Sequence, residues 1–226
     1  MESIPISSVS LRQRGKARRQ ADIVAAAAAL WRERGIENVS LSEIAARAEV
    51  APQTVYNLIG GLDAIGFAVI KVALERLDDE LGVASSTGIE LALDAARISS
   101  GLYTADERLY RQVLVRIPRV LFEGTHLGRD TADTAIRAMQ QAWEAGEIRR
   151  DVDPERLGRT MYVNYLGALY DWACGDSSDA DFRTAAEVAV LAPAAACAAE
   201  PVRPRMTERL IASLSSDAKA IAVGEL

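Results

Sequence analysis

The feature that most constrains the fold is the stretch from Ser40 to Leu62, which predicts two short helices separated by a tight turn. Ser40 and Glu43 have the spacing of a capping box, so a helix is predicted to begin there. Its apolar period stops at Glu49, and Pro52 marks a second start, because proline is tolerated in the first turn of a helix. Two short helices joined in this way predict a helix-turn-helix.

The second of these helices is predicted to carry a polar outer face. Val55 and Ile59 take its inward positions, which leaves Gln53, Thr54 and Asn57 facing outward. Amide side chains can bond both N6 and N7 of adenine in the major groove, and threonine can bond a base or a phosphate. The stretch therefore predicts double-stranded DNA as a partner.

Together with the helix before it, the segment from Gln20 to Ile65 resembles the DNA-binding domain of the TetR family of bacterial transcriptional repressors. The resemblance rests on the aromatic-x-x-x-glycine step from Trp31 to Gly35 and on matches that follow it in order: Val39, Ile44, Ala45, Ala48, Val50, Thr54, Val55 and Tyr56. It implies a set of DNA-contacting residues: Ser40, Ser42, Pro52, Gln53, Thr54, Tyr56 and Asn57. Tyr56 has an alternative role as a core residue over Trp31, and Ser40 has one as a helix cap only.

Two departures from the family pattern bear on DNA affinity. Glu49 stands where the family usually has glycine, and it must adopt a left-handed conformation there or the turn must be rebuilt. Leu62 stands where the family usually has a lysine that meets a DNA phosphate. These changes put affinity in question and leave the fold unaffected.

Charge is distributed unevenly along the chain. The net charge of the whole chain is −6, whereas residues 1–60 hold eight Lys or Arg against six Asp or Glu. Residues 1–19 show no apolar period and are predicted to form a flexible basic arm with five cations: Arg12, Arg14, Lys16, Arg18 and Arg19. The arm is either a solubilising tail or a segment that contacts DNA.

The composition predicts an all-α fold, because half of the residues are hydrophobic, only 5% are aromatic, and alanine and leucine are abundant. After the helix-turn-helix domain at 20–62 we expect a helical effector-binding and dimerisation domain at 63–215 and a tail at 216–226. Helix starts are predicted at two further capping boxes, beginning at Thr87 and Thr104, and at caps near Asp130 or Thr131 and at Asp153.

The helix that follows Pro154 is apolar nearly all round, which is typical of a helix buried on both sides. We expect one side to serve the protomer core and the other, around Tyr165, Leu166 and Leu169, to serve a partner. The alanine-dense helix 179–199 is the expected second half of the dimer-forming pair, as the family resemblance also implies. A two-fold homodimer in turn predicts a pseudo-palindromic operator.

The resemblance also implies an effector pocket inside the helical body. Candidate lining residues are Tyr103, Tyr110, Phe122, His126, Trp143, Tyr162 and Tyr165, with Asn164 and Arg97 as further polar contacts. Each of them has a core or surface role as its alternative. The scarcity of aromatic and charged residues favours an apolar or moderately polar effector.

Catalysis is not expected, because the chain has one histidine and none of the common nucleotide-binding, nucleophile or metalloprotease motifs. No metal and no cofactor are predicted. The two cysteines fit reduced thiols, and neither a signal peptide nor a membrane span is predicted, so a cytoplasmic location is expected. The leading hypothesis is a ligand-responsive transcriptional regulator, and the family resemblance implies a repressor. The alternatives are a DNA-binding regulator without a ligand, and a helical ligand-binding or interaction protein with a weakened helix-turn-helix.

Overall fold

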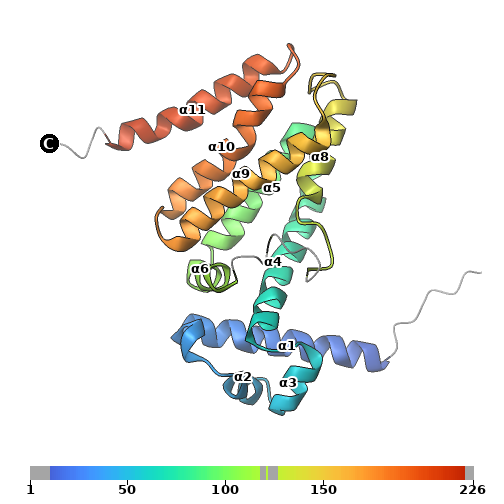
Figure 1. Cartoon of the computed structure of the whole chain (residues 1–226), viewed down its shortest axis with the longest axis vertical. Coiled ribbons are helices and arrows are strands. Elements are labelled where there is room, and N and C mark those ends of the chain that lie inside the picture. The colour runs from blue at the N-terminus through green and yellow to red at the C-terminus, as the bar shows by residue number, and fades with distance from the viewer. Residues whose placement is uncertain (1–10, 118–120, 122–126, 222–226) are drawn as a thin grey trace, which may run out of the picture. The chain divides into compact units, whose positions relative to one another are not determined.

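The computed structural model describes residues 11–117, 121 and 127–221. Within them the regular structure is helical (Figure 1), and the β-type pairing is limited to an isolated antiparallel bridge between Ile148 and Ala198. The predicted all-α fold class is confirmed.

The chain forms two compact units, residues 1–70 and residues 71–226. The division falls inside α4, Leu62–Ala84, whereas the sequence placed it at the start of that helix. The boundary lies later than predicted because α4 is one unbroken helix, and its first turns belong to the N-terminal unit. These turns contribute three buried side chains, Ile65, Val69 and Ile70.

The N-terminal unit contains α1 (Leu11–Arg34), a 3₁₀ turn η1 (Ile36–Asn38), α2 (Leu41–Arg47), α3 (Pro52–Leu58) and the start of α4. Helix α1 packs against η1, α2 and α3, and α2 packs against α3. The core of this unit is a set of fully buried apolar side chains: Ile23, Ala27, Trp31, Ile44, Ala45 and Val55.

The first helix is longer than predicted, because α1 begins at Leu11 and not near Ala21. The predicted flexible arm is therefore wrong for residues 11–19, while residues 1–10 lie outside the described part of the chain. The segment has no apolar period because none of its faces is buried, and its described side chains are mostly exposed. Extending an existing helix requires no new nucleus, and lysine, arginine and glutamine are good helix formers, so this end is helical without a buried face.

The C-terminal unit contains the rest of α4 and six further named helices: α5 (Gly88–Thr104), α6 (Glu107–Arg116), α8 (Asp133–Glu144), α9 (Pro154–Cys174), α10 (Asp179–Cys197) and α11 (Arg203–Ile221). Helix α9 packs against α6, α8 and α10, α5 packs against α6, α8 and α10, and α11 packs against α10. Helix α11 extends into the segment predicted as a tail, so residues 216–221 are helical.

Local sequence signals place some helix ends correctly. The Asp153 side chain accepts hydrogen bonds from the backbone N–H groups of Glu155 and Arg156, as the Asp-Pro start predicted. Helix α6 ends at Arg116, before Pro118. A capping box at the start of α10, formed by Ser178 and Asp181, was not predicted from the sequence.

Thr87 is the N-cap residue of α5, as predicted, but the capping boxes predicted at Thr87 and Thr104 are absent. The Thr87 side chain makes no cap bond; instead Glu147 Oε2 accepts from the N–H of Ile89 at 3.0 Å. Thr104 is the last residue of α5, and its hydroxyl accepts from Arg183 Nη2 at 2.6 Å. In both places the hydrogen bond is made by a side chain from a distant part of the sequence, Glu147 or Arg183, and not by a residue three positions away.

The residues that motivated a partner-facing side on α9 lie in the interior of the protomer. Leu166 and Leu169 are 1% and 0% exposed, and the Tyr165 hydroxyl is covered. This part of the prediction is wrong for Leu166 and Leu169, because α9 packs against α6, α8 and α10, whereas Val163 on the same helix is 58% exposed. The outward side of α9 carries smaller and more polar residues.

No single helix among the described residues combines the length and the hydrophobicity of a membrane span. Helices α3 and α4 pass that test only when taken together, as a pair bent by 58°.

Candidate functional site

The first element of the candidate DNA-binding surface is the start of α2, where the predicted capping box is present. Ser40 Oγ accepts from the N–H of Glu43 at 3.3 Å, and Glu43 Oε2 accepts from the N–H of Ser40 at 2.8 Å. Arg34 adds an ion pair to Glu43 at 2.8 Å. The backbone and hydroxyl bonds from Ser40, followed by the bond from Arg34, lower the pKa of Glu43 to about 2. Ser40 therefore serves as a cap, and Ser42 lies exposed in the first turn beside it.

The turn between α2 and α3 contains the strained residue that the sequence predicted. Glu49 has φ 54°, a left-handed conformation that side chains other than glycine rarely adopt. The turn is closed by a hydrogen bond from the N–H of Val50 to the carbonyl of Ala45 at 2.9 Å. The helix-turn-helix geometry is thus kept without glycine, at the cost of backbone strain at this one residue.

Helix α3 presents the polar face that the sequence predicted. Val55 is fully buried, whereas Pro52, Gln53, Tyr56 and Asn57 are exposed and Thr54 is half-buried. Gln53 Nε2 donates to Asn57 Oδ1 at 2.9 Å, so the two amides are paired on one side of the helix. Tyr56 is 63% exposed, which rules out its alternative role as a core residue over Trp31.

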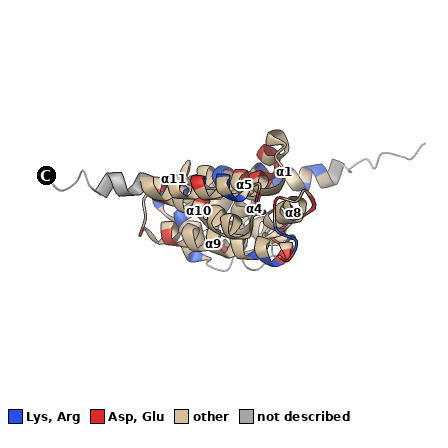
Figure 2. Ribbon diagram, turned by 90° about the horizontal axis from the view of Figure 1, so that it is seen from above, with Lys and Arg blue, Asp and Glu red and all other residues tan. Residues whose placement is uncertain are grey.

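The basic segment of α1 continues directly from the helix-turn-helix. Gln20 Nε2 donates to the carbonyl of Leu58 at 2.7 Å, which satisfies a carbonyl at the end of α3 and ties α1 to it. Before this contact, four basic residues are exposed on the first turns of α1: Arg14, Lys16, Arg18 and Arg19. Figure 2 shows blue ribbon on this helix. Arg12 belongs to the same helix, but its side chain lies outside the described part.

The residues that build this surface match a known family. The family model described as "Bacterial regulatory proteins, tetR family" matches residues 23–58, which run from the buried Ile23 of α1 to the last residue of α3. The chain carries the TetR-family DNA-binding domain. The exposed face of α3 lies within this matched segment.

Solved structures of TetR-family regulators share the fold of about four fifths of the chain. SmeT, the repressor of the Stenotrophomonas maltophilia multidrug efflux pump SmeDEF, has a TM-score of 0.62 and 24% identity, with 81% of this chain and 92% of that chain covered. FadR from Thermus thermophilus in complex with lauroyl-CoA has a TM-score of 0.62 and 20% identity, covering 77% and 92%. RolR in complex with resorcinol has a TM-score of 0.62 and 18% identity, covering 86% and 94%. No curated protein matches the chain.

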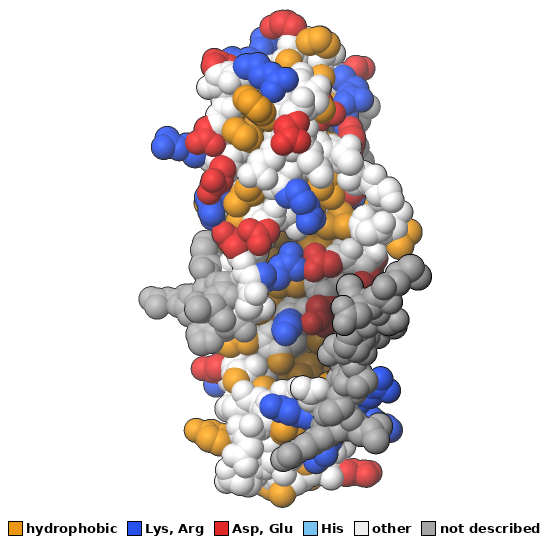
Figure 3. Space-filling view, turned by 90° about the vertical axis from the view of Figure 1, so that its right-hand side faces the viewer, with side chains coloured by type: hydrophobic (Ala, Val, Ile, Leu, Met, Phe, Trp, Pro, Cys, Tyr) orange, Lys and Arg blue, Asp and Glu red, His pale blue; other side chains and the backbone are white. Residues whose placement is uncertain are grey.

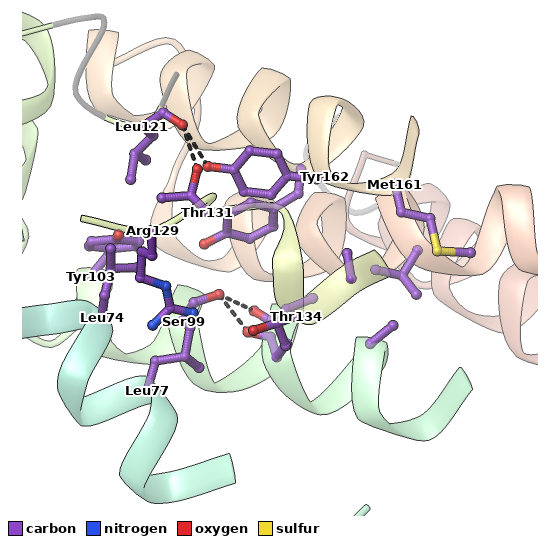
Figure 4. A pocket seen from close by; sticks show the side chains of 16 residues that line it. Leu74, Leu77, Ser99, Tyr103, Leu121, Arg129, Thr131, Thr134, Met161 and Tyr162 are labelled. Carbon is purple, nitrogen blue, oxygen red and sulfur yellow. Dashed lines mark hydrogen bonds between the residues drawn. The ribbon is translucent and has the colours of Figure 1, made fainter. Parts of the chain in front are cut away.

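The C-terminal unit contains a pocket with an empty volume of about 660 Å³, counted out to its open mouth (Figure 4). Three of the residues predicted to bind an effector line it: Tyr103, Tyr162 and Tyr165. Several lining residues carried no sequence signal, because small hydroxyl and apolar side chains on amphipathic helices resemble any core: Leu74, Leu77, Ser99, Thr131, Thr134 and Met161.

The other predicted effector contacts lie elsewhere. Tyr110 packs edge-on against Tyr103, with ring centroids 5.0 Å apart, and does not line the pocket. Trp143 has the Arg150 guanidinium 4.5 Å above its ring and is likewise not in the lining. Asn164 is exposed, and Arg97, also exposed, is paired with Asp94 at 2.6 Å. Phe122 and His126 fall outside the described residues.

Most polar groups of the pocket are bonded within the protein. The Tyr162 hydroxyl and the Thr131 hydroxyl both donate to the carbonyl of Leu121, at 2.9 Å and 2.7 Å, as the dashed lines in Figure 4 show. The Ser99 hydroxyl donates to the carbonyl of Ala95 at 2.6 Å. Arg129 forms an ion pair with Asp78.

Burial raises the pKa of the phenols that line the pocket. Desolvation is the largest cause that raises the pKa of Tyr103, Tyr162 and Tyr165 above the ordinary value of 10.0. These side chains are therefore hydrogen-bond donors across the physiological range. Within the described residues no cluster of three or more His, Cys, Asp or Glu side chains could hold a metal ion.

Proposed function

We propose that the protein is a dimeric, ligand-responsive transcriptional repressor that binds a pseudo-palindromic operator and is released from it by a small-molecule effector. The observation that carries this proposal is the exposed pair of amides on α3, Gln53 and Asn57, which one hydrogen bond joins. The helix that carries them is fixed by its buried Val55 and follows the capped helix α2. Side chains fixed in this way lose little conformational freedom when they bond a base edge.

The pocket of the C-terminal unit supports the response to an effector. Structures of proteins with this fold have been solved with lauroyl-CoA, triclosan and resorcinol, which differ widely in size and polarity. A pocket lined by apolar residues and a few hydroxyl groups has the usual makeup of a small-molecule site.

A dimer through α9 and α10 fits the residues that these helices expose. Their outward positions include Val163, Gly167, Ala185, Ala192 and Ala196, which are small enough for helices of two protomers to approach closely. At Gly167 an added Cβ would meet no atom within 4 Å, so this side of α9 is open in the protomer.

Selection of bound duplexes from a random-sequence pool tests the proposal. We expect a two-fold symmetric site whose half-sites are about 34–36 Å apart or a multiple of that distance. Gln53→Ala should weaken binding to the selected site by about 1–3 kcal/mol and relax the base preference at one position of each half-site. Gln140→Ala, on the exposed face of α8, is the matched control and should bind as the unaltered protein does. Absence of any enriched sequence would refute the proposal.

A further inference from the structure

The pocket of the C-terminal unit disfavours charged ligands. Among the described lining residues, Arg129 is the only side chain that is charged at neutral pH, and it already forms an ion pair with Asp78. An anionic ligand would have to compete with that carboxylate, and a cationic ligand would find no carboxylate among the lining residues. Burying an unpaired charge among apolar side chains is costly, so both classes are disfavoured.

One polar group of the lining remains without a partner. The Tyr165 hydroxyl oxygen is covered from solvent and makes no hydrogen bond in the described part of the chain, although the residue itself lines the pocket and is half-buried. Ser99 acts as a side-chain hydrogen-bond partner that lowers the pKa of this phenol, but the two hydroxyl groups do not meet at hydrogen-bond distance, and the Ser99 hydroxyl donates to the carbonyl of Ala95 at 2.6 Å. A buried donor that lacks an acceptor destabilises the protein, so an acceptor delivered through the pocket gains that free energy.

The other hydroxyl groups are less available for a ligand. Tyr162 and Thr131 share the Leu121 carbonyl, and a ligand would have to break one of those bonds. Thr134 lies in α8, where a threonine hydroxyl can turn to a carbonyl of the preceding turn. A phenol at the end of a rigid side chain has no such local alternative.

We infer that the effector is an uncharged, largely apolar molecule that offers one oxygen acceptor, such as a ketone, ester or ether oxygen, to the Tyr165 hydroxyl. The inference rests on the proposed ligand response of this same pocket, and it adds the chemical class of the ligand and the residue that selects for it.

Three probes with one shared carbon frame test this class: 2-acetylnaphthalene is neutral with an acceptor, 2-ethylnaphthalene is neutral without one, and 2-naphthoate is an anion. Calorimetric titration of the full chain should give the tightest binding for the ketone. Tyr165→Phe should weaken ketone binding about tenfold, the usual effect of one hydrogen bond, and leave the affinity for 2-ethylnaphthalene unchanged. Tyr103→Phe is the matched control and should change ketone affinity less than threefold, or about 0.6 kcal/mol.

Folding of the variant is not at risk, because Tyr165→Phe removes a single unbonded oxygen. The variant should therefore melt at the same temperature or higher. Naphthoate that binds as tightly as the ketone would overturn the inference, and so would equal ketone affinities of Tyr165→Phe and the unaltered protein, or a ketone that fails to bind up to its solubility limit. A ketone that meets these ratios but does not release operator DNA would leave the ligand class standing and refute the proposed regulation.

Discussion

At the scale of single residues, the helix-turn-helix contains one strained position and one unusually acidic carboxyl group. Glu49 holds a left-handed backbone conformation, and Glu43 is bonded by both the backbone and the hydroxyl of Ser40. Both are local features of the segment from α2 to α3, so each can be altered without touching the buried core.

Replacing Glu49 by glycine should stabilise the N-terminal unit. A left-handed conformation costs a side-chain-bearing residue about 1–2 kcal/mol, and glycine adopts it freely. We expect Glu49→Gly to raise the melting temperature and also to strengthen DNA binding, because it removes a negative charge beside the proposed recognition helix. Glu49→Gln separates the two effects, since it removes the charge and keeps the strain. It should strengthen DNA binding without the gain in thermal stability, and equal melting temperatures of the Gly and Gln variants would contradict this account.

The carboxyl group of Glu43 should make α2 sensitive to acid. Its pKa is about 2 in the folded chain against an ordinary value of 4.5, because the charged form accepts the bonds from Ser40 and Arg34. A lowered pKa means that the stabilisation is fully present above pH 4.5 and is lost as the pH falls from there towards 2. Hydrogen exchange of the α2 amides should accelerate across this window relative to Glu43→Gln, which has no charge to lose. Parallel exchange profiles of the two proteins would show that the bond contributes nothing to this helix.

At the scale of elements, the approach of α9 to α8 depends on a single glycine. A Cβ at Gly158 would lie 2.6 Å from Ile136 Cα and 2.8 Å from the Ala135 carbonyl oxygen, so the two helices would have to separate. We expect Gly158→Ala to lower stability by about 1–3 kcal/mol, although alanine is the better helix former.

Gly101→Ala in α5 is the control for this prediction, because an added Cβ there meets no atom within 4 Å. It should raise stability by roughly 0.5–1 kcal/mol. Thermal unfolding of the two variants should therefore shift in opposite directions, and a shift in the same direction would mean that α8 yields to the added methyl group.

The helical start of α1 makes the role of the basic segment testable by substitution. Arg14 and Arg18 lie one turn apart on the same exposed side of the helix. If both contact phosphates, Arg14→Gln together with Arg18→Gln should reduce the salt dependence of operator binding by about 1.8 per protomer in log–log slope. The control variant carries Arg137→Gln together with Arg205→Gln, at two exposed positions of the C-terminal unit. An unchanged slope would assign the segment a solubilising role.

At the scale of the whole molecule, the face shown in Figure 3 carries charges of both signs interspersed with one another. The net charge of −6 therefore does not oppose DNA binding by a local basic region, because exposed charges are screened over about 8–10 Å at physiological salt. The proposed dimer likewise depends on a particular surface and not on the overall charge.

A charge placed on the outward side of α9 should prevent dimerisation. Val163 is 58% exposed, so Val163→Glu is compatible with the protomer fold and incompatible with a close apolar contact between two copies. Light scattering at micromolar concentration should report a dimer for the unaltered protein and a monomer for the variant. Val83→Glu, at a valine that is 86% exposed near the end of α4, should remain dimeric. A monomeric unaltered protein, or two variants with the same mass, would refute the proposed interface.

The sequence by itself determined the parts of this protein that depend on neighbours within a few residues. The Ser40 capping box, the Pro52 start of α3, the strained Glu49 and the Asp153 cap were all predicted and are present. The outward face of α3 was predicted for the same reason, because helical periodicity follows from the chain alone. Caps, turns and periodicity are short-range effects, and they define the helix-turn-helix almost completely.

Only the tertiary structure decided which groups from distant segments meet. Glu147 accepts a hydrogen bond at the helix start that Thr87 was expected to cap, and Arg183 donates to the Thr104 hydroxyl. Helices α6, α8 and α10 pack against α9, where Leu166 and Leu169, which had suggested a partner, are buried. The pocket belongs to the same class, since it brings together side chains from α4, α5, α8, α9 and α10. An unpaired phenol such as that of Tyr165 is invisible in the sequence, because whether a polar group is satisfied depends on every helix packed around it.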